Sequence, residues 1–169
     1  MEKVDFWRLI ESAKVAGGAD CEGQTEALVT RLERLPADEI VAFDQIFSTL
    51  HAEAFRWDLW GAAYVINGGC SDDGFFYFRS WLIGQGRSVY ENALDDPETL
   101  ADSDVEPEEA ECEELGYAAA RAYEAKTGTK LPTADRANDP QEPFGQQWDE
   151  DDLESLFPLL YDRYGTEPD

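Results

Sequence analysis

The stretch 57–83 constrains the fold of this chain more than any other part of it. It joins two segments dense in aromatic residues through an Asn-Gly-Gly turn at 67–69, and glycine suits the left-handed conformation that ends a helix. Ser71 follows as the expected N-cap of the next segment. We therefore predict one helix over 57–66 and a second over 72–85.

The second of these helices is apolar almost all round. Its large apolar residues are Phe75, Phe76, Phe78, Trp81, Leu82 and Ile83. A helix of this kind is typical of the centre of a fold. No segment shows a convincing strand alternation, and no internal repeat is evident. We predict an all-α fold, a compact single-domain bundle of about six to eight helices with a long acidic, proline-containing C-terminal section.

Apolar residues at helical spacing mark the remaining helices. We expect them over 5–16 with Asp5 as N-cap, over 24–35, from 37 to a break near Phe55, through Val89 to Leu94, over 110–126, and after Asp149 as N-cap, with Pro158 kinking or ending that last helix. The expected organisation is a helical domain over 1–127, a loop over 128–148, and a C-terminal helix in 149–169 that packs on the same domain. A loop of that length in a compact domain is often functional.

Three motifs in the aromatic stretch carry a family resemblance. They read W-D-L-W-G-A-A-Y at 57–64, I-N-G-G-C-S-D-D-G-F at 66–75 and Y-F-R-S-W-L-I at 77–83. They resemble the signature of a bacterial domain family known only as a domain of unknown function, with similarity over roughly the first three quarters of the chain. The resemblance implies a shared fold and carries no established activity.

The chain is strongly acidic, with a net charge of −25 over 169 residues. Residues 1–90 hold 8 basic and 14 acidic residues, whereas 91–169 hold 5 basic and 24 acidic, so the excess lies in the second half. Such a field repels nucleic acid and anionic lipid surfaces, and it favours basic protein partners or cations. We expect no direct nucleic-acid binding; solubility alone is the simpler explanation of the charge.

The cysteines and the apolar runs bear on the compartment. Cys21, Cys70 and Cys112 are widely separated, with no C-x-x-C pair, which argues against a disulfide framework and a zinc site. No apolar run approaches the length of a membrane span. These features predict a cytoplasmic protein with no membrane association.

Arg79 lies in the apolar arc of the central helix. A buried guanidinium requires a carboxylate partner, because an unpaired buried charge is costly. We expect that partner to be Asp58, Asp72 or Asp73. Two interpretations stay open: a structural ion pair that holds two helices in register, and a group that binds an anionic moiety.

The turn before the central helix also has two interpretations. A helix N-terminus favours an anion, but Asp72 and Asp73 already occupy this one and favour a self-satisfied cap. Together with Asp58 they could act as paired acids or bind calcium or magnesium, yet their spacing matches no EF-hand loop. We expect no metal and no cofactor.

The aromatic residues could form the core or an interface, since tryptophan and tyrosine are common interface anchors. The candidate binding residues of the stretch are Trp57, Asp58, Trp60, Asn67, Asp72, Asp73 and Arg79. We predict no catalytic residue: His51 stands alone, and acidic neighbours oppose a reactive thiolate at Cys70. The sequence has no phosphate-binding loop, dinucleotide fingerprint or nucleophile elbow.

Two functions follow from these features. The first is a non-enzymatic interaction or regulatory module that binds a basic protein surface, such as a nucleic-acid mimic or an immunity-type inhibitor of a cationic toxin. The second is a small enzyme or ligand-binding domain whose pocket is roofed by tryptophans and lined by Asp58, Asn67, Asp72, Asp73 and Arg79.

Overall fold

The computed structural model describes residues 1–18, 20–133 and 136–165 and confirms the all-α prediction. Its α-helices are α1 (Lys3–Gly17), α2 (Cys21–Leu32), α3 (Ala37–Glu53), α4 (Trp57–Asn67), α5 (Asp72–Gly84), α6 (Arg87–Asp95), α7 (Ala118–Thr127), α8 (Leu153–Leu156) and α9 (Pro158–Tyr164), and its 3₁₀-helices are η1 (Pro97–Asp102), η2 (Glu114–Tyr117) and η3 (Glu150–Asp152). Within these ranges the chain forms no β-strand, only a single bridge between Arg56 and Phe144.

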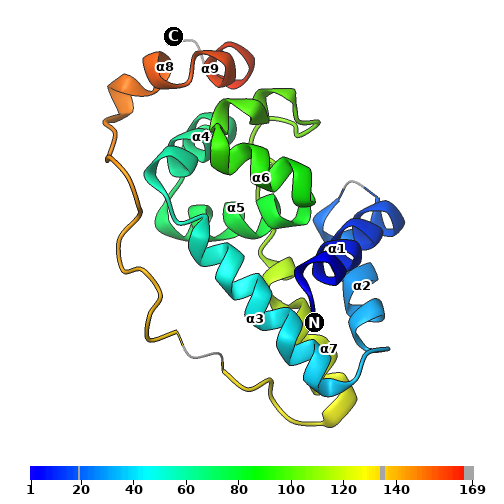
Figure 1. Cartoon of the computed structure of the whole chain (residues 1–169). Helices are drawn as coiled ribbons and strands as arrows, with labels where there is room; N and C mark the ends of the chain where they lie inside the picture. Colours follow the sequence, from blue (N-terminus) through cyan, green and yellow to red (C-terminus); the bar gives the residue numbers. More distant parts are fainter. Residues whose placement is uncertain (19, 134–135, 166–169) are drawn as a thin grey trace.

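Helix α5 occupies the centre of the bundle, as its sequence predicts. It contacts α1, α3, α4, α6 and η2, which surround it in Figure 1. Its side chains Phe78, Leu82 and Ile83 are completely buried. Because apolar residues cover almost the whole helix, burial on every side removes the most apolar surface from water.

The two predicted boundaries of α4 are confirmed. Gly68 ends the helix in the left-handed conformation with φ of 65°. Ser71 then caps α5, since its Oγ accepts a hydrogen bond from Gly74 N at 3.1 Å. On the other side, Arg56 is extended and separates α3 from α4 near Phe55.

The helix expected over 110–126 starts later, at α7. The backbone before it is bonded elsewhere: Ala110 N donates to Asn67 Oδ1 at 3.0 Å, and Cys112 N donates to the Tyr77 carbonyl at 3.1 Å. These bonds compete with the helical hydrogen bonds that residues 110–113 would otherwise make. At the N-terminus, α1 begins at Lys3, so Asp5 lies in the first turn and is not the N-cap.

The cysteine expectation is wrong. Cys21, at the start of α2, forms a disulfide with Cys112, with their Cα atoms 5.5 Å apart. Their sequence separation of 91 residues gave no indication that the fold brings them together. Cys70 is the free cysteine. The disulfide removes one of the arguments for a reducing compartment.

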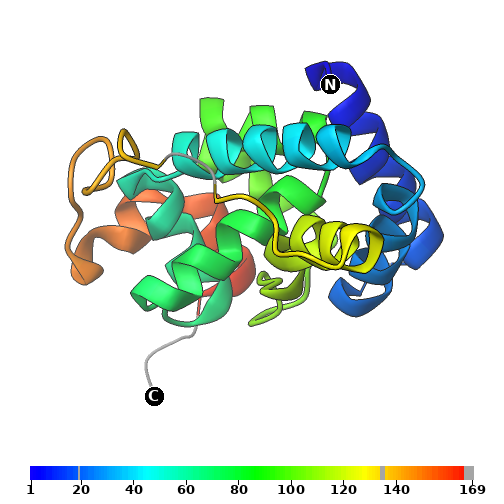
Figure 2. The ribbon, with the colours of Figure 1, turned by 90° about the horizontal axis from the view of Figure 1, so that it is seen from below.

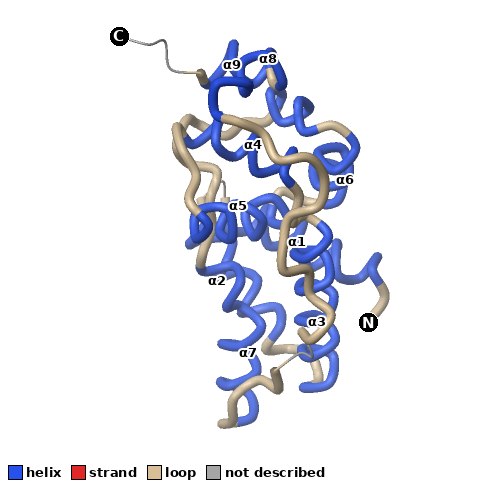
Figure 3. Tube along the Cα trace, turned by 90° about the vertical axis from the view of Figure 1, so that its left-hand side faces the viewer, coloured by secondary structure: helices blue, strands red, loops and turns tan. Residues whose placement is uncertain are grey.

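The segment after α7 runs along the outside of the helices to α8 (Figures 1 and 3). It is held near its end by two backbone hydrogen bonds: Phe144 N donates to the Phe55 carbonyl and Trp57 N donates to the Phe144 carbonyl, each at 2.9 Å.

The C-terminal section forms two short helices where we expected one, because Pro158 begins α9. Asp149 makes no side-chain capping bond.

Helix α9 packs against α4 and η1. Leu153, Phe157 and Leu160 are buried in the same core as the N-terminal helices. Among the described residues, no helix combines the length and the apolar character that crossing a bilayer requires.

Candidate functional site

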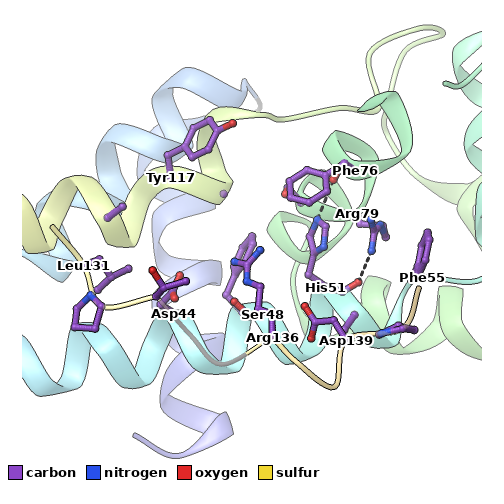
Figure 4. Close-up of a pocket in the computed structure, with 18 of the residues that line it drawn as sticks. Asp44, Ser48, His51, Phe55, Phe76, Arg79, Tyr117, Leu131, Arg136 and Asp139 are labelled. Atoms are coloured by element: carbon purple, nitrogen blue, oxygen red, sulfur yellow. Dashed lines mark hydrogen bonds between the residues drawn. The ribbon is translucent and has the colours of Figure 1, made fainter. Parts of the chain in front are cut away.

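A cavity of about 640 Å³ lies between α3, α5, α7 and the segment after α7, in its described residues 130–133 and 136–141. Figure 2 shows α3 in cyan and α7 in yellow beside each other, with the yellow segment after α7 passing along them. Residues of α3 line one wall, and α5 supplies Phe76, Arg79 and Ser80 (Figure 4). The last residue of η2, Tyr117, and Ala120 of α7 also line the cavity. The volume is in the range typical of small-molecule sites.

Arg79 is the most unusual residue of this cavity. Its side chain is 8% exposed, yet the described residues provide it with no ion pair. Its guanidinium carbon lies 4.6 Å from the ring centre of Phe55 and 5.5 Å from that of Phe76. These cation–π contacts offset part of the cost of burying the charge. Burial lowers the pKa of Arg79 to about 10, so the group stays charged at neutral pH.

The guanidinium is only partly hydrogen-bonded. Nη1 donates to the His51 carbonyl at 3.0 Å (Figure 4), whereas Nε is buried without a partner and no contact of the described residues engages Nη2. Buried polar groups are rarely left unsatisfied, because each lost bond costs about 1–3 kcal/mol. An unbonded charged donor of a residue that lines a cavity is therefore suited to an anion.

His51 supports this wall as a neutral ring. Burial, and secondly the charge of Arg79, lower its pKa to about 3. Its Nε2 lies 3.0 Å from the Phe76 carbonyl oxygen (Figure 4). A carbonyl only accepts, so the proton sits on Nε2 and Nδ1 is the nitrogen able to accept. The His51 ring is therefore uncharged at neutral pH and adds no positive charge to that of Arg79.

Ser80 supplies a second unbonded group. The residue is 1% exposed, and its Oγ has no hydrogen-bond partner. It lies beside Gly116: a Cβ added at Gly116 would lie 3.5 Å from Ser80 Oγ, an ordinary contact distance.

The charged side chains around the cavity balance one another. The basic groups are Arg79, Lys130 and Arg136, and the acidic groups are Asp44, Glu124 and Asp139. Burial raises the pKa of Asp44, and Arg136 opposes that shift. Asp139 acts on Arg79 from a distance, favouring its charged form without forming an ion pair.

The structure does not gather the predicted binding residues into one pocket. Asp58 pairs with Arg56, its neighbour in sequence, at 3.1 Å. These two line a second cavity of about 470 Å³ together with Trp148 and Phe157. Trp57 and Trp60 stack on each other with ring centres 5.1 Å apart, and Trp60 Nε1 donates to the Cys70 carbonyl at 2.9 Å.

Asn67 binds the backbone of Ala110 through both ends of its amide, at 3.0 and 3.1 Å. Asp72 and Asp73 are exposed in the first turn of α5. The prediction that Asp58, Asp72 or Asp73 neutralises Arg79 is therefore wrong: Arg56 has taken Asp58, and the two aspartates of α5 face solvent. Arg79 alone of the seven candidates lines the larger cavity.

Several residues that line the cavity were not predicted from the sequence as site residues. Asp44, Ser48, His51 and Phe55 follow one another at spacings of three or four, so they share one face of α3 and its end. That face and the long proline-containing segment were the available signals. Neither indicates Arg79 as the common neighbour.

Two further groups were considered for chemistry. Cys21, Cys112 and Glu114 have ligand atoms within 4.8 Å of one another, but the two sulfurs are joined in the disulfide and are not thiolate ligands. Burial, followed by Glu111 and Asp72, raises the pKa of Cys70 to about 12, so its thiol stays protonated at neutral pH. Neither group supports catalysis.

Comparison with known proteins places this architecture in a family without assigning it an activity. No curated protein and no solved structure matches the chain. One family model matches residues 1–125, which contain α1 to α6, η2 and most of α7. The chain therefore belongs to the family described as "Protein of unknown function (DUF4240)".

Proposed function

We propose that this protein binds a small organic anion in the cavity at Arg79. The observation that supports it is the charged, buried guanidinium whose Nε has no partner. A structural arginine at such a position would be paired, because an unpaired buried charge destabilises the fold. A bound anion would neutralise this charge and satisfy the open donors.

The site favours binding over catalysis. Its neutral His51 lies against the Phe76 carbonyl, and no nucleophile with an activating base is found among the described lining residues. Ser80 Oγ has no hydrogen bond to a base. We therefore assign the cavity to recognition of a ligand.

The Nε–H group of Arg79 provides a direct test, because it gives a separate signal in a two-dimensional ¹H–¹⁵N NMR spectrum. The signal is assigned by its loss in Arg79→Lys, and acetate, benzoate, phosphate and phenyl phosphate are titrated in turn. We expect at least one anion to shift the Arg79 signal saturably and to leave the exposed Arg8 unchanged. No shift of Arg79 with any of the four would refute the proposal.

A second candidate function is the binding of a basic protein surface. It is favoured by the acidic residues of 95–114: nearly all are exposed, and the described structure gives none of them an ion pair. Uncompensated carboxylates attract a cationic partner from solution. This function would use a surface distinct from the cavity at Arg79.

A lysine-rich peptide is a suitable probe for this surface. Replacing Glu106, Glu108 and Glu109 with Gln should weaken its binding, and replacing the exposed Glu22, Glu33 and Glu53 in the same way is the charge-matched control. Weakening confined to the first variant supports a defined acidic surface. Equal weakening would show that only net charge matters.

A further inference from the structure

The larger cavity indicates the chemical class of its ligand, an inference that rests on the proposed anion binding. We propose that the ligand is a monocarboxylate with an apolar body. Its carboxylate lies side-on against the Nε and Nη2 edge of Arg79, and its body extends past Phe76 toward Tyr117.

The hydrogen bonding of Arg79 indicates a carboxylate. Nη1 donates to the His51 carbonyl, and neither Nε nor Nη2 has a hydrogen-bond partner among the described residues. These two N–H groups are parallel on one edge of the planar guanidinium and match the two oxygens of a carboxylate. The two donors on this edge give each carboxylate oxygen one hydrogen bond.

Charge argues against a phosphate dianion. The six charged side chains around the cavity cancel, and the whole chain carries −25. His51 is neutral, so the buried end presents one positive charge, while Lys130 and Arg136 are exposed on the segment across the cavity. The Gly116 N–H is already bonded to the Glu113 carbonyl at 3.1 Å and adds no donor. A second negative charge would remain uncompensated.

The remaining walls are suited to an apolar group. Phe76 is 40% exposed and Tyr117 50% exposed, although both border the cavity. Leu131 is partly buried and lies near Tyr117, at the end of the cavity away from Arg79 (Figure 4). Large exposed aromatic residues around a polar anchor are typical of sites that bury the body of a small ligand.

Four probes test the class: benzoate, acetate, phenyl phosphate and benzyl alcohol, compared by calorimetry on the full chain. We expect benzoate to bind at least about tenfold more tightly than each of the others, since one missing charged hydrogen bond or apolar contact costs about that much. Stronger binding of phenyl phosphate would overturn the carboxylate assignment and leave anion binding intact. Equal binding of acetate would overturn the apolar body. Binding of none would refute both proposals.

Two variants locate the groups of the ligand. Arg79→Lys keeps the charge but loses the two parallel N–H donors, so benzoate affinity should fall about tenfold. Phe76→Ala should weaken benzoate more than acetate, and Phe144→Ala, at an exposed phenylalanine outside this cavity, is its matched control. Unchanged benzoate binding in both cavity variants would place the ligand elsewhere. Thermal unfolding of each variant checks that it is folded.

Discussion

Arg79 donates a hydrogen bond from Nη1 to the backbone carbonyl of His51 across 3.0 Å. The bond joins α5 to the last turn of α3 and fixes which edge of the guanidinium is turned away from the helix. Phe55 and Phe76 make cation–π contacts with the same group. The fold therefore holds a positive charge in a defined orientation beside a cavity, and the described residues provide no hydrogen bond to two of its nitrogens.

Replacing this arginine should separate binding from stability. In Arg79→Met the apolar chain is kept while the buried charge is removed, so we expect a free energy of unfolding within about 1 kcal/mol of wild type, or higher. The measurement is urea denaturation without ligand, with Arg8→Met at an exposed position as control. A loss of several kcal/mol would identify Arg79 as a structural group.

Asp139 should compete with the bound anion. Its carboxylate favours the charged form of Arg79 and makes no hydrogen bond itself within the described residues. Asp139→Asn removes this competing charge, so we expect benzoate affinity to rise about two- to fivefold. Glu142→Gln, which changes the net charge equally at an exposed neighbouring position, is the control. An equal rise in both variants would show a general charge effect.

Protonation of His51 should destabilise the protein in acid. Its pKa is lowered to about 3 by burial and by Arg79 and Arg136, so the unfolded chain binds a proton that the folded one does not. Stability due to the neutral ring is complete above the unfolded pKa of about 6.5 and decreases as the pH falls toward the folded value. Asp44, whose pKa burial raises, acts in the opposite direction.

His51→Gln keeps a side-chain donor for the Phe76 carbonyl and removes the titration. Between about pH 7 and about pH 4, wild type should lose about 2 kcal/mol more than this variant in urea denaturation. The comparison cancels the carboxylates that both proteins share. Parallel stability curves would mean that His51 is protonated in the folded protein.

The sequence predicted the parts of the fold that depend on local chemistry. The Asn-Gly-Gly turn, the Ser71 cap and the central position of α5 all follow from residues within one or two helical turns of each other. The burial of Arg79 followed from the same periodicity. Spacing along a helix indicates which face a residue occupies. This information is sufficient to predict the turn, the cap, the central helix and the burial of Arg79.

The neighbours of Arg79 could not be predicted in this way. Periodicity does not say which helix covers a face. The cavity combines α3, α5, α7 and the segment after α7, which lies about fifty residues beyond Arg79 in the sequence. Asp58, Asp72 or Asp73 was expected to pair with Arg79, but Asp58 pairs with Arg56 and the other two are exposed. The Cys21–Cys112 bond was missed for the same reason, since tertiary packing alone brings the two cysteines together.

That disulfide should contribute strongly to stability. It closes a loop with a sequence separation of 91 residues, and loops of this size are stabilised by about 4 kcal/mol when cross-linked. Reduction, or Cys112→Ala, should lower the free energy of unfolding by about that amount, whereas Cys70→Ser should leave it unchanged. Mass spectrometry of alkylated protein counts the free thiols. Three free thiols in air-oxidised folded protein would contradict the pairing.

The C-terminal helices should be an integral part of the folded domain. Gly61 on α4 faces Phe157, and a Cβ built there would lie 2.5 Å from Phe157 Cε2 and 3.0 Å from Trp148 Nε1. Gly61→Ala therefore forces the ring of Phe157 to move, and we expect it to cost about 1–3 kcal/mol.

The matched control is Gly74→Ala in the first turn of α5, where an added Cβ meets its neighbours at an ordinary 3.4 Å. That change should be neutral or should stabilise by up to about 1 kcal/mol, because alanine is the better helix former. Thermal unfolding compares both with wild type. If Gly61→Ala were also neutral, Phe157 would not be packed against α4, and the section after 148 would not share the core of the N-terminal helices.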